Sequence, residues 1–213
     1  MLDIGANIGT TTIPRIVAGD FQKAYAVEAE WLDFSCLVHN VHANRVQGLV
    51  FPDYRAIFSF TGSVKFLVED HSGTHRVVTG ERARWKGQDV PCMTLDDWTT
   101  WCGVDAGDVD FVKCDVEGSE GHVLEGATEL LALRNAVWQL EYAPHRLRGL
   151  GTTQAMLMDT VGHWFTHFVI LGKGGKGLQP TIRPIQEITS GIESLGLGEK
   201  GFTNILLYPS DPR

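Results

Sequence analysis

The run VDFVKCDV, residues 109–116, is the feature of this sequence that most constrains its fold. A nearly continuous apolar segment of strand length is typical of a central parallel strand, which is covered on both faces. Similar short apolar runs alternate along the chain with amphipathic stretches, which is the pattern of layered α/β proteins. We therefore expect one open, mostly parallel sheet with helices on both faces.

The same alternation predicts where the elements lie. The first strand is represented only by a stub, so we expect it to be truncated. The expected strands lie at residues 2–4, 23–28, 48–51, 63–69, 109–116, 136–142, 167–171 and 202–209, with 63–69 in an antiparallel excursion. The expected helices lie at residues 10–18, 31–43, 94–101, 120–133, 152–164 and 184–195. Residues 73–87 are expected to form a surface loop, and residues 172–177 a flexible turn.

Composition narrows the class of protein. The 213 residues suit one large domain, and we expect a single domain over residues 1–213. A net charge of −8 argues against a nucleic acid as the main partner, because phosphate binding needs clustered Lys and Arg. We find neither an apolar run long enough for a membrane span nor a signal peptide. The four cysteines form no C-x-x-C pair, so reduced thiols and a cytoplasmic location are expected.

Two histidine pairs invite a search for a metal site. His71 and His75 frame one loop, and His163 and His167 are four residues apart within an apolar stretch. Neither pair has a third ligand at a regular spacing, whereas zinc sites use four ligands, mostly Cys and His. We therefore expect no metal site formed by these residues.

The first loop, DIGANIG, predicts a ligand that carries no phosphate. Gly5 and Gly9 flank Asn7 where a dinucleotide fold would have a further glycine, and Asp3 precedes them. A carboxylate at this place would repel a pyrophosphate and attract an ammonium group. Glu28 ends the second expected strand, where an acid can accept both ribose hydroxyls of a nucleoside. S-adenosylmethionine, a cationic nucleoside without phosphate, fits this combination, although Glu28 could also be a solvated strand end.

Four blocks of the sequence occur together in one known family. They are DIGANIG with its acid and glycines, the acid Glu28, TLDD at residues 94–97, and KCDVEGSE at residues 113–120. In this order they resemble the FkbM family of S-adenosylmethionine-dependent methyltransferases. The resemblance covers residues 1 to about 143 well, and the segment TNILLYP near the end is similar but less specific. The fourth block is the specific one, since many methyltransferases share the first loop.

The resemblance implies a fold, a cofactor and a reaction. The fold would be Rossmann-like, of the class I methyltransferase type, with an antiparallel last strand. S-adenosylmethionine would be bound by residues of the first two blocks, namely Asp3, Gly5, Ala6, Asn7, Gly9 and Glu28. The reaction would be methyl transfer to a hydroxyl of a sugar, a polyketide or another small metabolite.

The chain departs from the family pattern in two places. VEAE lacks the proline that commonly follows the acid of the second strand, which leaves the turn less rigid. Family members also usually carry residues before the first loop that complete the first strand and cap the site. We therefore expect either a fragment or a cap supplied from elsewhere.

Methyl transfer to a hydroxyl needs a group that takes the proton. Asp115 ends the fourth expected strand of the parallel sheet and is our first candidate for contact with the methyl group and the acceptor. Glu117 follows it, and the two acids could share a proton or hold Mg²⁺, although no motif supports a metal. His145 is a candidate base by its pKa range and equally a surface histidine. Glu120 is more readily explained as the acid that begins a helix.

Other functions remain open at this level. The missing front of the domain is compatible with a non-catalytic or catalytically impaired cofactor-binding domain of the same fold. A nicotinamide oxidoreductase is disfavoured by Asp3 and Asn7. We expect a small-molecule hydroxyl acceptor, and no nucleic-acid or membrane partner. The loops 74–88 and 172–180 are expected to shape the acceptor pocket, while the acceptor and the oligomeric state are not defined by the sequence.

Overall fold

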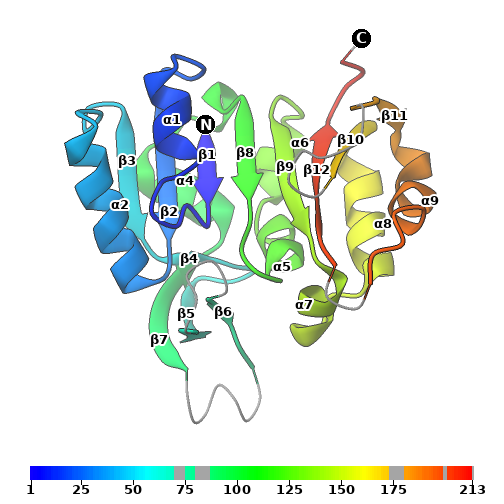
Figure 1. The fold of residues 1–213 in the computed structure, drawn as a ribbon, viewed down its shortest axis with the longest axis horizontal. Helices are drawn as coiled ribbons and strands as arrows, with labels where there is room; N and C mark the ends of the chain where they lie inside the picture. The colour runs from blue at the N-terminus through cyan, green and yellow to red at the C-terminus, as the bar shows by residue number, and fades with distance from the viewer. Residues whose placement is uncertain (70–74, 80–86, 173–179, 199–200, 213) are drawn as a thin grey trace.

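The computed structural model describes residues 1–69, 75–79, 87–172, 180–198 and 201–212 (Figure 1). Its centre is an eight-stranded sheet with the strand order β11-β10-β12-β9-β8-β1-β2-β3. The strands of this sheet are β1 Leu2–Ile4, β2 Ala24–Glu28, β3 Val50–Tyr54, β8 Phe111–Cys114, β9 Val137–Tyr142, β10 His167–Gly172, β11 Arg183–Pro184 and β12 Thr203–Tyr208.

Five neighbouring strands, from β3 to β9, run parallel to one another. The last strand, β12, is antiparallel to both of its neighbours, β9 and β10. This is the mostly parallel, Rossmann-like sheet that was predicted, with its antiparallel last strand, and β1 is three residues long. The strand order reverses between β1 and β8, and ligands of open α/β sheets bind beyond the carboxyl ends of the strands at such a point.

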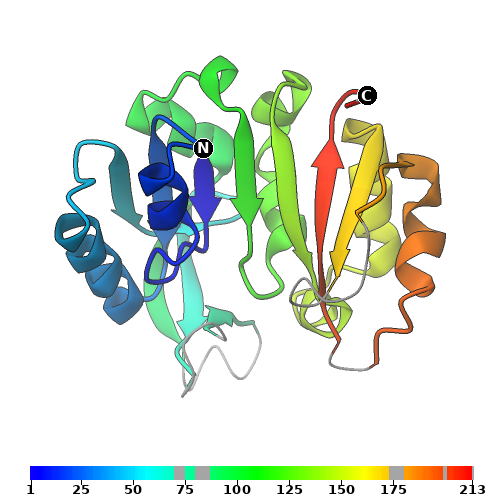
Figure 2. The same cartoon turned by 45° about the horizontal axis from the view of Figure 1, so that its top comes forward.

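Helices cover both faces of the sheet (Figures 1 and 2). One apolar core joins α1 and α2 to β2 and β3, and a larger one joins α4, α5, α6 and α8 to the opposite face. No described helix is both long and apolar enough to cross a membrane. The helices are α1 Thr12–Val17, α2 Trp31–Ala43, α4 Leu95–Cys102, α5 Glu120–Glu125, α6 Thr128–Ala132, α7 Pro144–Gly149, α8 Gln154–Trp164 and α9 Ile188–Glu193, with the 3₁₀ turns η1 Ala106–Asp108 and η2 Ile185–Glu187.

A second, four-stranded sheet is inserted between β3 and α4. Its strands are β4 Ala56–Ile57, β5 Gly62–Leu67, β6 Arg76–Val77 and β7 Gln88–Met93, in the order β4-β7-β5-β6. Because β5 is antiparallel to β6 and β7, the predicted antiparallel excursion is confirmed. In Figure 1 this sheet lies below the carboxyl ends of the parallel strands. The expected loop 73–87 contains β6, and its residues 73–74 and 80–86 lie outside the described ranges, as do residues 173–177 of the expected turn 172–177.

The prediction of one continuous helix over residues 120–133 is wrong, because the chain forms α5 and α6 there. Gly126 separates the two helices, and a Cβ on it would lie only 2.4 Å from the carbonyl oxygen of Phe58. The carboxylate of Asp96 then accepts hydrogen bonds from the N–H groups of Glu129 (2.9 Å) and Leu130 (3.2 Å), which begins α6 anew. The apolar spacing of residues 120–133 is preserved, but a tertiary contact breaks the helix.

Several other boundaries differ less. The helix expected at 31–43 is α2 with the same bounds, and the one expected at 10–18 is shorter. The third strand begins two residues later than expected and continues through Pro52 to Tyr54. The expected helix at 184–195 is divided into η2 and α9. Sequence reasoning did not predict α7, although Pro144 stands at its start, where proline is favoured.

Candidate active site

A cavity of about 430 Å³ opens at the carboxyl ends of the parallel strands, where a ligand is expected. The loops after β1, β2, β8 and β9 form most of its wall, and the inserted sheet closes one side. Its lining includes Gly5, Ala6, Asn7 and Thr10 after β1, Glu28 and Asp33 near β2, Asp115, Glu117 and Ser119 after β8, Glu141 and Arg146 near β9, Phe202 and Asn204 near β12, and Ile57, Phe66, His75 and Val77 from the insertion.

The first loop passes directly against the end of β8. Gly5 has φ 78°, and a Cβ at this position would lie 1.9 Å from the carbonyl oxygen of Asp115. The N–H groups of Gly5 and Ala6 both donate to the carbonyl of Val27, each at 3.0 Å. Glycine is therefore required at position 5 for two reasons, its left-handed backbone and the close approach. The contact places the loop after β1 beside the acid that ends β8.

Asn7 connects this loop to the end of β2. Its N–H donates to Glu28 Oε2 at 2.8 Å, and its side-chain Nδ2 donates to Asp33 Oδ2 at 2.9 Å. Asn7 has φ 52°, a left-handed conformation that asparagine tolerates better than most residues. Glu28 Oε1 accepts a further hydrogen bond from the N–H of Glu30 at 2.7 Å. Burial raises the pKa of Glu28 to about 7, and the N–H groups of Glu30 and Asn7 oppose this rise.

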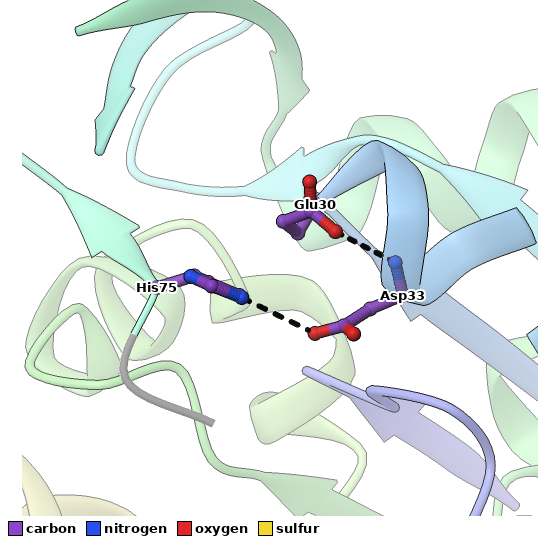
Figure 3. A group of neighbouring side chains, drawn as sticks. All are labelled: Glu30, Asp33 and His75. Atoms are coloured by element: carbon purple, nitrogen blue, oxygen red, sulfur yellow. Dashed lines mark hydrogen bonds and ion pairs between the residues drawn. The ribbon is translucent and has the colours of Figure 1, made fainter. Parts of the chain in front are cut away.

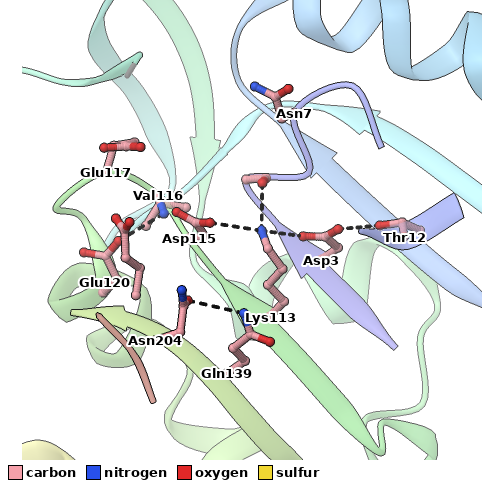
Figure 4. A network of polar contacts seen from close by, with 12 residues as sticks. Asp3, Asn7, Thr12, Lys113, Asp115, Val116, Glu117, Glu120, Gln139 and Asn204 are labelled. Carbon is pink, nitrogen blue, oxygen red and sulfur yellow. Dashed lines mark hydrogen bonds and ion pairs between the residues drawn. The ribbon is translucent and has the colours of Figure 1, made fainter. Parts of the chain in front are cut away.

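Asp3 lies where sequence reasoning did not place it. Its side chain is fully buried and forms no part of the cavity wall. It accepts a hydrogen bond from the Thr12 hydroxyl and pairs with Lys113 Nζ at 3.1 Å (Figure 4). The ammonium group that pairs with Asp3 is therefore that of Lys113 in the protein itself. The signal for this lies in the strand pairing, since Asp3 and Lys113 are register partners in β1 and β8.

Lys113 links the two halves of the site. Its Nζ donates to the Gly5 carbonyl at 3.1 Å and lies 3.5 Å from Asp115 Oδ2. Burial opposes the charged form, but Asp3 and Asp115 together raise the pKa of Lys113 above its ordinary value. Lys113 therefore remains a cation and cannot serve as a base near neutral pH.

Gly9, the second glycine of the predicted cofactor loop, also lies outside the cavity wall. A Cβ on Gly9, which has φ 89°, would meet the side chains of Ile13 and Leu37, each at 2.8 Å. This glycine allows the loop to pack onto α1 and α2. The close packing explains why glycine stands at this position in the loop.

Three carboxylates gather at the other end of the cavity. Asp115, Glu117 and Glu141 each offer an oxygen, and these atoms lie within 4.8 Å of one another. Arg146 of α7 reaches between two of them, because its Nη1 pairs with Glu117 and lies 3.1 Å from Glu141 Oε2. Glu117 has φ 57°, a backbone conformation that is uncommon for a residue other than glycine and that the surrounding structure must hold in place.

Burial and mutual repulsion raise the pKa of two of these carboxyl groups, Glu117 and Glu141. The pKa of Glu117 is raised to about 8 by burial and then by the neighbouring Glu141, while Arg146 lowers it. The pKa of Glu141 is raised to about 7 by burial and then by Asp115, again against Arg146. A carboxyl group with such a pKa can gain and lose a proton near neutral pH, whereas an ordinary one stays ionised there. The cluster is therefore suited to proton transfer.

The remaining candidates lie outside the wall of the cavity. Glu120 is fully buried at the start of α5, and its Oε1 accepts the N–H groups of Val116 (3.0 Å) and Gly118 (3.3 Å). This geometry favours the structural explanation of Glu120. His145 is half-buried in α7, and its side chain forms no part of the cavity wall.

Figure 3 shows a second group of potential metal ligands, Glu30, Asp33 and His75. His75 Nδ1 accepts the N–H of Glu69 at 3.0 Å, so the proton of the neutral ring is on Nε2. Nε2 faces Asp33 Oδ2 at 3.6 Å and in this state has no lone pair for a metal. The three carboxylates of the main cluster have the oxygen ligands that Mg²⁺ prefers, but Arg146 already contacts two of them.

The sequence matches the family described as "Methyltransferase FkbM domain" over residues 3–158. The chain belongs to the FkbM methyltransferase family. A structure of methyltransferase FkbM from Methylobacillus flagellatus has the same fold, with a TM-score of 0.61 and 15% identity. That alignment covers 98% of this chain and 43% of the other, so this chain spans less than half of the length of that protein.

Two further solved structures are more distant. Precorrin-6y C5,15-methyltransferase from Geobacter metallireducens gives a TM-score of 0.46 at 12% identity, covering 98% of this chain and 78% of that one. The tRNA methyltransferase TrmK of B. subtilis gives 0.48 at 10% identity, covering 99% and 60%. Both similarities are too weak to inform function. No curated protein sequence matches this chain.

The residues that line the cavity of this FkbM domain fit S-adenosylmethionine. Glu28 presents a carboxylate where a ribose could donate two hydroxyls, and Ile57, Phe66 and Val77 offer apolar surface for a purine. Asp115 supplies a negative charge near the position of a cationic centre. A cavity of about 430 Å³ lies within the range of roughly 300–1,000 Å³ that holds ligands of this size.

Sequence reasoning missed some of the lining residues. Glu141 was not predicted to be catalytic, and Arg146 was not singled out because α7 was not predicted. Phe202 and Asn204 come from the antiparallel last strand and the segment before it, which nothing in the local sequence connects to the first loop. Further lining residues that no pattern indicated include Thr10, Thr11, Asp33, Arg55, Ile57, Phe66, Val77 and Ser119.

Proposed function

We propose that this domain binds S-adenosylmethionine and transfers its methyl group to a hydroxyl of a small acceptor such as a sugar or a polyketide. The observation that supports this most directly is that one cavity combines the glycine loop, Glu28, the acids after β8 and Glu141 near the end of β9. A cofactor end and a proton-accepting end therefore face the same space. The overall charge of −8 and the acidic rim favour a small, non-nucleic acceptor over a nucleic acid.

The cofactor end of the cavity binds and orients S-adenosylmethionine. The main chain of Gly5 to Asn7 brings backbone close to the ligand, and the Glu28 carboxylate accepts hydrogen bonds from the ribose hydroxyls. Both oxygens of Glu28 already accept one N–H each, so the carboxylate is fixed in direction before the ligand arrives. S-adenosylmethionine supplies an electrophilic methyl group on a sulfonium. Much of the rate comes from holding the acceptor oxygen in line with this methyl.

The acidic end removes the proton. We assign Glu117 as the base, because its raised pKa and its place in the cavity wall suit proton transfer from a hydroxyl. The acceptor oxygen forms the new bond to the methyl carbon, the carbon–sulfur bond breaks with its electron pair going to sulfur, and the hydroxyl proton passes to a Glu117 oxygen. Asp115 stabilises the positive charge before transfer and helps to orient the acceptor.

Calorimetry with S-adenosylhomocysteine tests cofactor binding. We expect saturable binding to the folded protein and a weaker complex with E28Q, which keeps the size but loses the charge of the ribose acceptor. A folded protein that shows no binding would reject the proposal.

Turnover tests catalysis separately. A panel of small hydroxyl compounds, assayed by formation of S-adenosylhomocysteine, should identify an acceptor whose methylation is lost in D115N. Cofactor binding without turnover on any acceptor would instead favour a non-catalytic cofactor-binding domain of the same fold.

A further inference from the structure

Helix α7 packs directly against the turn that carries Glu117. A Cβ on Gly118 would lie 2.8 Å from the carbonyl carbon of Arg146, so only glycine permits this approach. Glu117 itself adopts a left-handed conformation, which is unfavourable for a residue with a Cβ. The surroundings must stabilise this conformation, and α7 is one of the elements that do so.

From this contact the side chain of Arg146 extends into the cavity. One nitrogen, Nη1, pairs with Glu117 Oε2 and lies 3.1 Å from Glu141 Oε2. The side chains of Arg146, Glu117 and Glu141 are 20%, 13% and 7% exposed. Water therefore screens these ion pairs only in part. The guanidinium is thus a shared partner of two carboxylates that otherwise repel one another.

Glu117 faces charged groups from four elements. Asp115 follows β8, Glu120 begins α5, Glu141 lies in β9 and Arg146 in α7. Burial and the three acids favour the protonated form of Glu117, whereas Arg146 favours the ionised form. Lys113 also acts on this cluster, because it lies 3.5 Å from Asp115.

We propose that Arg146 is a positioning residue of the acceptor site, which directs the Glu117 carboxylate toward the acceptor and favours its ionised, proton-accepting form. Arg146 does not take the proton itself, because a guanidinium stays protonated in proteins. The proposal rests on the proposed function, since a base is needed only if a hydroxyl is methylated. It makes α7, which no sequence pattern predicted, part of the catalytic arrangement.

A titration of the carboxyl groups tests the proposal without any acceptor. Carbon-13 NMR of labelled glutamate side chains, with the Glu117 signal assigned by its absence in E117Q, gives the titration midpoint directly. In R146Q we expect this midpoint to rise by about one pH unit or more, because an opposite charge is removed. R148Q is the matched control, since Arg148 lies on the same helix but is exposed, and it should leave the midpoint unchanged. An unchanged midpoint in folded R146Q overturns the proposal.

The pH dependence of turnover gives the second readout. Because the base must be ionised, the acidic limb of the kcat profile should move to higher pH in R146Q, so the loss should be large at pH 7 and small at pH 9.5. A merely structural role would lower kcat by the same factor at every pH, which would contradict the proposal. If the wild type neither binds S-adenosylhomocysteine nor turns over, the proposed function fails, whereas the NMR titration still decides the role of Arg146.

If R146Q does not fold, the same titration and kinetic measurements on R146K test the proposal. Lysine retains the charge but not the planar fork that contacts two carboxylates. We expect the Glu117 midpoint to move less than in R146Q and kcat to fall about tenfold, with KM for the cofactor unchanged. An R146K protein with both the wild-type midpoint and the wild-type kcat would overturn the proposal.

Discussion

The two ends of the cavity are built by different means. At the cofactor end, main-chain hydrogen bonds fix most of the geometry. The N–H of Gly5 donates to the carbonyl of Val27, and the N–H groups of Asn7 and Glu30 donate to Glu28. At the acceptor end, side-chain charges hold one another, with Arg146 between Glu117 and Glu141. The first arrangement is insensitive to pH except through Glu28, whereas the second depends on which acids are ionised. A fixed cofactor site beside an adjustable proton-transfer site follows from this difference.

The largest effect should come from breaking the cofactor end. G5A would place a Cβ 1.9 Å from the Asp115 carbonyl and impose a left-handed alanine, so we expect a loss of roughly 3 kcal/mol or more in the free energy of unfolding. Chemical denaturation measures this loss. G19A is the control, because Gly19 has φ 80° but no atom within 4 Å of its Cβ, and it should cost only about 1 kcal/mol. Equal losses for the two variants would show that the loop does not press against β8.

A second variant should separate the two ends. E117Q removes the proposed base but keeps its size, so we expect kcat to fall by about 10²–10³-fold while the affinity for S-adenosylhomocysteine stays within about twofold. Steady-state kinetics and calorimetry measure the two quantities. The control is E125Q, at an exposed position at the end of α5, with no change in either. A matching loss of cofactor affinity in E117Q would mean that the two ends are not distinct.

The third prediction concerns the pH dependence of stability. Burial raises the pKa of Glu120 from 4.5 to about 8 in the folded protein, so between these values the folded state binds more protons than the unfolded state. The free energy of unfolding should therefore fall as pH rises from 5 to 8, by about 3 kcal/mol from this group. E120Q should flatten the dependence in urea unfolding, although Glu28, Glu117 and Glu141 retain part of it. The same slope in E120Q and wild type would contradict this assignment of the buried proton.

Much of the fold could be predicted because its signals are local. The apolar run at residues 109–116 gives β8, and the spacing of apolar residues gives α2 with its observed bounds. Residues 120–133 show the limit of such reasoning, since their apolar spacing is continuous while Gly126 lies between two helices, packed closely against the carbonyl of Phe58. That contact joins residues far apart in the chain, and no local pattern reports it.

The candidate site divides in the same way. Gly5, Asn7, Glu28, Asp115 and Glu117 were all named from motifs, and all line the cavity. Asp3 and Gly9 belong to the same motif but do not line the cavity, because one pairs with Lys113 and the other packs onto α1 and α2.

The sequence by itself determined the layered α/β architecture, the family and the strand ends at which a ligand can bind, because periodicity and short motifs are properties of neighbouring residues. Only the tertiary structure decided which acids face the cavity, which are neutralised internally, and that Arg146 joins two of them. Side-chain charge and burial are set by partners from other strands and helices, such as Lys113 opposite Asp3 and α7 against Gly118. Electrostatic environment is a property of the packed molecule, and the chemistry of this site depends on it.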